Sequence, residues 1–127
     1  MRAIVLAAGE GSRMLSTQPK SLHLVDGVPM TLRVLNSLDG IDLDVIVVVV
    51  GSQARLVSET LFQMSDNPIR LEFAEQTVRR GTADAARVGL EQFGLGDLSD
   101  LDMKTVMLMI ICWCQESHLI RQVPRLV

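Results

Sequence analysis

Residues 45–50 read Val45-Ile46-Val47-Val48-Val49-Val50, and the run closes at Gly51-Ser52. β-Branched residues fill the run, and they favour strands because their side chains pack well on a pleated surface. No polar residue alternates with the apolar ones, so both faces of the strand are expected to be covered. The run therefore predicts a central strand of a mostly parallel sheet.

Three further segments predict strands elsewhere in the chain. Residues 2–8 form an apolar run, which ends at Gly9, and residues 69–74 are predicted to form a short strand after the helix-breaking pair Asn67-Pro68. Residues 105–112 form the last run, after a polar connection that contains glycine and aspartate.

Helical periodicity fills the segments between these runs. Pro29 suits the first turn of a helix of about three turns that stops at Gly40. Ser52 is expected to cap a second helix, and Thr82 a third helix that runs to about Phe93. Strand and helix thus alternate, which predicts an α/β fold: a Rossmann-like three-layer sandwich with a mostly parallel sheet and helices on both faces.

Composition narrows the class of protein. The chain has 127 residues, 48% of them hydrophobic, and a formal net charge of −3, which fits one globular domain without a second full domain. This small charge disfavours bulk binding to nucleic acid but permits a local basic pocket. The longest apolar stretches, 45–50 and 106–114, are well below the roughly 20 residues of a membrane span, and the first run is too short for a secretory signal. We therefore expect a soluble, cytoplasmic protein with no membrane or nucleic-acid partner.

The segment after the first strand carries residue types that bind phosphate. In open parallel sheets, ligands bind beyond the carboxyl ends of the strands, here the loops after residues 8, 50, 74 and 112. The first of these loops reads Gly9-Glu10-Gly11-Ser12-Arg13, and Pro19-Lys20 follow. Glycines let backbone N–H groups approach a ligand, and Arg13 and Lys20 supply charge for phosphate oxygens. On the glycines alone, a plain turn with two solvated cations is an equally good interpretation.

Two common phosphate-binding motifs do not match this loop. A dinucleotide fingerprint needs a third glycine where Met14 stands, and a P-loop needs Gly-Lys followed by Ser or Thr. The loop therefore belongs to another class of phosphate-binding segment.

The order of the motifs resembles the start of the sugar-phosphate nucleotidyltransferases. The shared text comprises Leu6-Ala7-Ala8-Gly9, Gly11-Ser12-Arg13-Met14, Pro19-Lys20 and Gly27-Val28-Pro29-Met30. Within that superfamily, residues 6–30 are most similar to the N-terminal part of the bacterial N-acetylglucosamine-1-phosphate uridyltransferases. The resemblance covers roughly residues 1–110 and implies a fold of the nucleotide-diphospho-sugar transferase type.

A second segment strengthens the resemblance. Residues 75–82 read Glu75-Gln76-Thr77-Val78-Arg79-Arg80-Gly81-Thr82 and are similar to that family's base-recognition loop. The resemblance implies that Gln76 binds the uracil edge, that Gly81 packs against the base or bonds to it, and that Thr82 belongs to the same nucleotide-binding loop. A neutral amide has both donors and acceptors, which suits a pyrimidine edge. Arg79 stands where the family commonly has a second glutamine, and by residue type alone Gln76 also fits a surface strand end.

The implied reaction is uridylyl transfer. An oxygen of N-acetylglucosamine 1-phosphate attacks the α-phosphorus of UTP in line, and pyrophosphate leaves. Positioning and cations accelerate such a step, and no covalent nucleophile is needed. The resemblance assigns Arg13 and Lys20 to the triphosphate as catalytic residues, and a divalent cation, normally Mg²⁺, to the bridge between the phosphates. It assigns the following residues at the end of the first strand and in the loop after it to nucleotide binding: Leu6, Ala7, Ala8, Gly9, Glu10, Gly11 and Ser12.

The last strand departs from the family pattern. In the family this strand ends in Gly-Asp, and the aspartate is a metal ligand, whereas Ile111 and Cys112 occupy these positions here. A neutral thiol is a poor ligand for Mg²⁺, so we assign no metal ligand. Cys112, Cys114 and His118 are too few, and too unusually spaced, to predict a zinc site.

These departures set the expected organisation of the chain. We expect residues 1–112 to form the nucleotide-binding half of a truncated transferase domain and residues 113–127 a divergent tail. Two rival functions stay open at this point. One is a noncatalytic nucleotide-binding fragment, which Cys112 favours. The other is a related transferase of guanylyl or cytidylyl groups, as in molybdenum-cofactor assembly, over which the Gln76 loop favours uridylyl transfer.

Overall fold

In the computed structural model, residues 1–9 and 16–94 are described in full, and residues 106–110 by their backbone. A parallel sheet runs through the centre of the described part. Its strands are β1 (Arg2–Ala7), β4 (Val45–Val50), β5 (Leu71–Glu75) and β6 (Val106–Ile110). They lie in the order β5-β4-β1-β6, and every neighbouring pair is parallel. β4 therefore lies inside the sheet, as its sequence predicts.

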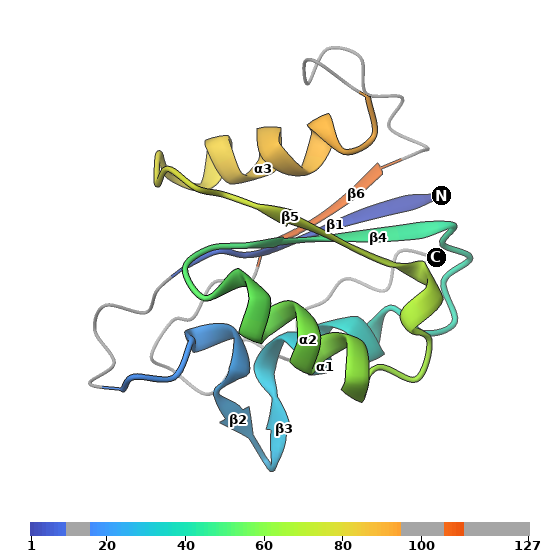
Figure 1. Ribbon diagram of the computed structural model, residues 1–127. Helices are drawn as coiled ribbons and strands as arrows, with labels where there is room; N and C mark the ends of the chain where they lie inside the picture. Colours follow the sequence, from blue (N-terminus) through green and yellow to red (C-terminus); the bar gives the residue numbers. More distant parts are fainter. Residues whose placement is uncertain (10–15, 95–105, 111–127) are drawn as a thin grey trace.

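Helices cover both faces of this sheet. Helices α1 (Met30–Ser37) and α2 (Ala54–Met64) lie on one face, and α3 (Thr82–Glu91) lies on the other (Figure 1). Alternate residues of a strand point to opposite faces. Ala3 and Val48 accordingly pack with α1 and α2, whereas Ile4 and Val49 pack with α3. The predicted three-layer α/β fold with a mostly parallel sheet is confirmed.

A small hairpin that the sequence patterns do not predict precedes α1. It joins β2 (Leu24–Val25) to β3 (Val28–Pro29) in antiparallel pairing. The two residues between them have positive φ angles of 49° and 77°, as a two-residue type I′ turn requires. Pro29 therefore ends β3 and precedes α1, and it does not lie in the first turn of the helix. The helix is correspondingly shorter than predicted, with 8 residues.

Three other predicted boundaries are wrong. Ser52 does not cap α2, because Gln53 intervenes in a left-handed conformation (φ 63°) and no side chain caps the helix. Thr82 is the first residue of α3, and Gly81 holds the capping position without a side-chain hydrogen bond. Ile69 is not part of β5, because a 3-10 turn that begins at Pro68 contains it and leaves it 93% exposed.

The last predicted strand is confirmed over residues 106–110, and Ile111 and Cys112 lie outside the described residues. Among the helices of the described part, none combines the length and the apolar character that a membrane crossing needs.

Candidate functional site

The carboxyl ends of β1, β4 and β5 meet at one edge of the sheet, because these strands are parallel neighbours. Ala8 and Gly9 follow β1, Gly51 follows β4, and Gln76 follows β5. In Figure 1 this is the left-hand edge, where β5 leads into α3 and β4 leads into α2. We call it the carboxyl edge. It is the edge at which parallel sheets bind ligands.

Direct contacts hold the three strand ends together. The backbone N–H of Gln76 donates to the carbonyl oxygen of Val50 at 2.8 Å, which continues the pairing of β5 with β4 beyond the strand. Gly51 lies against Ala8, and a Cβ at this position would be 2.5 Å from the Ala8 carbonyl oxygen. Only glycine permits this approach. The loop after β1 and the loop after β5 are thus joined through the end of β4.

The segment that leads to Lys20 is anchored at the same edge. The side-chain Nε2 of Gln53, just beyond β4, donates to the carbonyl oxygen of Thr17 at 3.3 Å. His23 Nε2 donates to the carbonyl oxygen of Gln18 at 3.1 Å. Lys20 begins the 3-10 helix η1 (Lys20–Leu22), is half-buried, and forms no ion pair with another described residue. Its charge is therefore not neutralised by any carboxylate of the described chain.

The loop between β5 and α3 is built around Gln76. This side chain is buried, with 7% of its surface exposed. Its Nε2 donates to Asp84 Oδ2 at 2.9 Å and to the Gly81 carbonyl oxygen at 3.3 Å. Gly81 has φ 88° and ψ −174°, a conformation that is essentially restricted to glycine. Gln76 and the first turn of α3 therefore form one hydrogen-bonded unit.

Asp84 connects this unit to the surface of α3. Its Oδ1 accepts a hydrogen bond from Arg87 Nη2 at 2.9 Å, and Arg87 also pairs with Glu91. The hydrogen bond from Gln76, followed by the one from Arg87, lowers the pKa of Asp84 below its ordinary value of 3.8. Asp84 is accordingly an anion at neutral pH, and an anionic carboxylate only accepts hydrogen bonds.

The predicted site residues differ in how far the structure places them. Leu6 and Ala7 are buried in β1, and Ala8 and Gly9 follow at the carboxyl edge. Gln76, Gly81 and Thr82 share one loop at that edge, and Lys20 lies in the anchored segment beside it. Their role in nucleotide binding stays a prediction. The remaining predicted residues lie outside the described part of the chain, and they are Glu10, Gly11, Ser12, Arg13 and Cys112.

Sequence reasoning missed two polar residues of the site. Neither Asp84 nor Gln53 is among the site residues that the sequence predicts. Asp84 lies in the first turn of a helix that follows a base-recognition-like loop, a signal that could have paired it with Gln76. Gln53 carries no comparable signal, because its contact with Thr17 joins residues 36 positions apart.

A metal centre does not form among the described residues. No group of three or more His, Cys, Asp or Glu side chains within them is placed to hold a metal ion. The donor set that Mg²⁺ prefers is therefore not assembled in this part of the structure. We accordingly assign no role as a metal ligand to any described residue.

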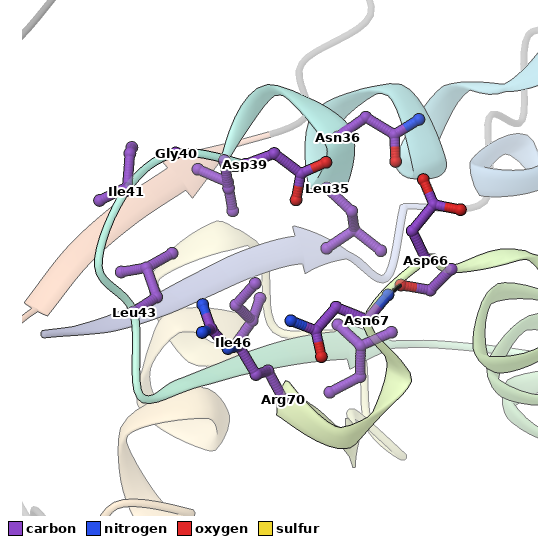
Figure 2. Close-up of a pocket in the computed structure, with 13 residues that line it drawn as sticks. Leu35, Asn36, Asp39, Gly40, Ile41, Leu43, Ile46, Asp66, Asn67 and Arg70 are labelled. Atoms are coloured by element: carbon purple, nitrogen blue, oxygen red, sulfur yellow. Dashed lines mark hydrogen bonds between the residues drawn. The ribbon is translucent and has the colours of Figure 1, made fainter.

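A hollow lies at the opposite, amino edge of the sheet. It has a volume of about 190 Å³ and lies beside the first residues of β4 and β5. Figure 2 shows Asn36, near the end of α1, and Asp39, just after this helix, across from Asp66, Asn67 and Arg70. It touches none of the predicted site residues. Topology and residue chemistry therefore both favour the carboxyl edge as the functional site.

Comparison with curated proteins gives relatives that match over part of their length. The chain is 40% identical over 90 residues to bifunctional protein GlmU of Streptococcus agalactiae, a match that covers 71% of this chain and 18% of that protein. It is 43% identical over 89 residues to GlmU of Rubrobacter xylanophilus, covering 70% of this chain and again 18% of the relative. The chain thus spans about a fifth of the length of the curated relatives that it matches.

A solved structure shares the fold. The crystal structure of HddC from Yersinia pseudotuberculosis complexed with GMP-PN matches with a TM-score of 0.59 and 22% identity, over 72% of this chain and 42% of HddC. In sequence, residues 3–100 match the family described as the MobA-like NTP transferase domain. This match includes β1, β4, β5 and the loops of the carboxyl edge, and the predicted resemblance to nucleotidyltransferases is confirmed. The chain therefore belongs to the MobA-like NTP transferase domain family.

Proposed function

We propose that this chain is the nucleotide-binding half of a domain that transfers a uridylyl group from UTP to N-acetylglucosamine 1-phosphate and releases pyrophosphate. Family membership supports a nucleoside triphosphate as the substrate class. The observation that carries the proposal is the juxtaposition of the Gln76 loop with the end of β1, through Val50 and Gly51. In this arrangement one nucleotide contacts the Gln76 amide through its base and the loop after β1 through its phosphates.

The proposed roles follow from the chemistry of phosphoryl transfer. Backbone N–H groups around Gly9 and Gly11 bind the triphosphate, and the base lies against Gln76 and Gly81. Arg13 and Lys20 offset the charge that collects on the phosphate oxygens during in-line attack at the α-phosphorus. Fixed positions for both reactants lower the barrier, because the step is then effectively unimolecular. This half of the domain comprises residues 1–112, and residues 113–127 form a divergent tail.

A second candidate function is nucleotide binding without transfer. Cys112 favours it, because a neutral thiol stands at the position where the family has its metal-binding aspartate and does not replace an oxygen ligand of Mg²⁺. Both candidates require the same nucleotide site, so a transfer assay separates them.

Calorimetric titration of the purified chain with UTP tests the nucleotide site. We expect Lys20→Ala to weaken UTP binding about tenfold, because a charge-assisted hydrogen bond to phosphate is lost. Arg70→Ala is the matched control, since it removes one exposed positive charge at the amino edge, and we expect a change of less than about twofold. Failure of the wild-type chain to bind any nucleotide contradicts both candidate functions, and a preference for GTP over UTP contradicts uridylyl transfer.

Release of pyrophosphate with UTP, N-acetylglucosamine 1-phosphate and Mg²⁺ then tests transfer. Release by the wild-type chain supports the transferase. Binding of UTP without release supports the second candidate, and release that appears only after Cys112→Asp places the defect at this position.

A further inference from the structure

The orientation of the Gln76 amide is fixed by two hydrogen-bond acceptors. Nε2 donates to Asp84 Oδ2 at 2.9 Å and to the Gly81 carbonyl oxygen at 3.3 Å. A carboxylate and a carbonyl have no protons to donate, so a reversed amide would place its Oε1 against two other oxygens. The NH₂ group is therefore committed to the protein, and Oε1 is directed away from both acceptors.

Asp84 is itself well placed to enforce this orientation. Its side chain is only 12% exposed, and Arg87 holds the other carboxylate oxygen at 2.9 Å. The hydrogen bond from Gln76, and after it the one from Arg87, lowers the pKa of Asp84, which is an anion at neutral pH. A hydrogen bond between a neutral amide and a largely buried carboxylate is stronger than one between neutral groups. The amide consequently has one favoured orientation.

Gly81 supplies a hydrogen-bond donor in the same loop. Its carbonyl oxygen accepts from Gln76 and from the N–H of Ala85 at 3.2 Å. Within the described part of the chain, no acceptor meets the Gly81 N–H and no donor meets Gln76 Oε1. The loop therefore presents one acceptor, Gln76 Oε1, and one donor, the Gly81 N–H.

We propose that Asp84 is a positioning residue that fixes the hydrogen-bonding polarity of Gln76 and thereby favours uracil over cytosine. The inference rests on the proposed function. Uracil carries a ring N3–H beside the O4 carbonyl, which match one acceptor and one donor. Cytosine in the same pose carries an N3 lone pair beside an N4 amino group, so both positions are reversed. Guanine has N1–H beside O6, so this device rejects cytosine and leaves the choice between uracil and guanine to other residues.

Asp84→Asn tests the role of the carboxylate. The introduced asparagine can accept from Arg87 through its oxygen, which turns its NH₂ group toward Gln76. Gln76 then loses its single favoured orientation: a rotated amide accepts from the asparagine but meets the Gly81 carbonyl oxygen, and its NH₂ group can replace Oε1 at the base. We expect the ratio of UTP to CTP affinity, measured by calorimetry, to fall about tenfold, which corresponds to one hydrogen bond of reversed polarity.

Glu91→Gln is the matched control for Asp84→Asn. It removes one negative charge from the same ion-pair network on α3 and leaves the bond between Gln76 and Asp84 intact. Both variants remove one negative charge that repels a triphosphate, so the comparison separates polarity from charge. We expect the control to keep the wild-type ratio within about twofold.

A charge-swap variant tests for rescue. In Gln76→Glu combined with Asp84→Asn, the introduced asparagine donates to one oxygen of the introduced glutamate. The second oxygen of that glutamate again offers an acceptor to the base, at unchanged net charge. We expect partial recovery of the UTP-to-CTP ratio, which a purely structural role of Asp84 does not produce. Circular dichroism establishes that each variant is folded.

Nuclear magnetic resonance of the wild-type chain tests the orientation of the Gln76 amide directly. This measurement does not depend on whether any variant folds. We expect the Gln76 side-chain NH₂ protons to resonate downfield of those of the exposed Gln63, and to exchange more slowly with water. Random-coil values for Gln76 overturn the fixed orientation. UTP binding with an unchanged ratio in Asp84→Asn overturns the role of Asp84 alone. Absence of UTP binding by the wild-type chain overturns the proposed function and this role together.

Discussion

The two edges of the sheet differ in how closely their residues pack and in whether they carry predicted site residues. At the amino edge, the ends of α1 and α2 leave a hollow of about 190 Å³ lined with polar side chains such as Asn67 and Arg70. At the carboxyl edge, the strand ends touch closely, and the Ala8 carbonyl oxygen lies where a Cβ of Gly51 would meet it at 2.5 Å. The hollow thus lies at the amino edge, whereas the predicted site residues that the structure describes lie at the carboxyl edge.

The topology of the sheet brings the predicted site residues together at the carboxyl edge. Parallel strands bring their carboxyl ends together, so loops that are distant in sequence share one edge. The backbone pairing of Gln76 with Val50 and the side-chain bond from Gln53 to Thr17 fix these loops relative to one another. A ligand that reaches several loops at once can be recognised here. The hollow at the amino edge has no comparable convergence of motifs.

Gly51→Ala has the largest expected effect at the carboxyl edge. Its Cβ would clash with backbone, which cannot move as a flexible side chain can. We expect the free energy of unfolding to fall by about 2–3 kcal/mol, and UTP affinity to fall at least about tenfold because the loop after β1 is displaced. Urea unfolding and calorimetry measure the two effects.

Gly40→Ala is the matched control at the amino edge. Gly40 lines the hollow, has a φ of 91°, and has open space where a Cβ would lie, so the cost is backbone strain of about 1 kcal/mol. We expect UTP affinity to stay unchanged. Equal losses of UTP affinity in Gly51→Ala and Gly40→Ala contradict the distinction between the two edges.

Gly81→Ala tests a second glycine of the carboxyl edge. No atom lies within 4 Å of the new Cβ, so the effect comes from the backbone conformation alone. We expect a loss of about 1–2 kcal/mol in the free energy of unfolding and UTP binding weakened about fivefold, because the Gly81 N–H is displaced. Unchanged binding of UTP in this variant excludes the Gly81 backbone from base recognition.

The dependence of stability on acid pH gives a smaller expected effect than the glycine substitutions. The pKa of Asp84 is lowered from 3.8, so its stabilising contribution is fully present above this pH and is lost as pH falls through the folded-state pKa. We expect the difference in unfolding free energy between wild type and Asp84→Asn to be constant from about pH 7 to 5 and to shrink below about pH 3.8. Urea unfolding at each pH measures this difference, and growth of the difference in acid contradicts the assignment.

Asp44 provides the corresponding acid at the amino edge. Its carboxylate accepts from the N-terminal ammonium at 2.7 Å, and this hydrogen bond lowers its pKa. The Asp44 side chain is 78% exposed, so solvent screens the pair. We expect Asp44→Asn to change the acid limb less than Asp84→Asn does, and to leave the UTP-to-CTP ratio unchanged.

The fold could be predicted from the sequence because apolar runs and helical periodicity agree. The run at 45–50 is the clearest case, since β-branched residues without polar alternation indicate a strand covered on both faces. Apolar runs and helical periodicity do not predict the hairpin of β2 and β3, although Asp26-Gly27 is a typical type I′ turn sequence. Strands of two residues are too short to give a periodic signal.

The first residues of the helices are harder to predict from the sequence than the strands are. Ser52 and Thr82 are favourable capping residues, yet Gln53 and Gly81 precede the first helical residues instead. In both cases a residue with positive φ sets the direction of the chain into the helix, and tertiary contacts override the capping preference.

From the sequence, the site could be predicted only at residues that belong to a recognisable motif. The sequence indicates Gln76 and Gly81 through their spacing, but it does not indicate the side chain that orients Gln76. That role depends on the fold of the loop, which brings Asp84 within 2.9 Å of an amide eight positions earlier.

Chemical-shift mapping of the ¹⁵N-labelled chain with UTP tests whether the nucleotide binds at the carboxyl edge. We predict that UTP shifts the backbone amide signals of Ala8, Gly9, Gln76 and Gly81 at the carboxyl edge, while those of Asn36, Asn67 and Arg70 around the hollow stay in place. Shifts confined to the residues around the hollow, with the carboxyl edge unaffected, would contradict the account.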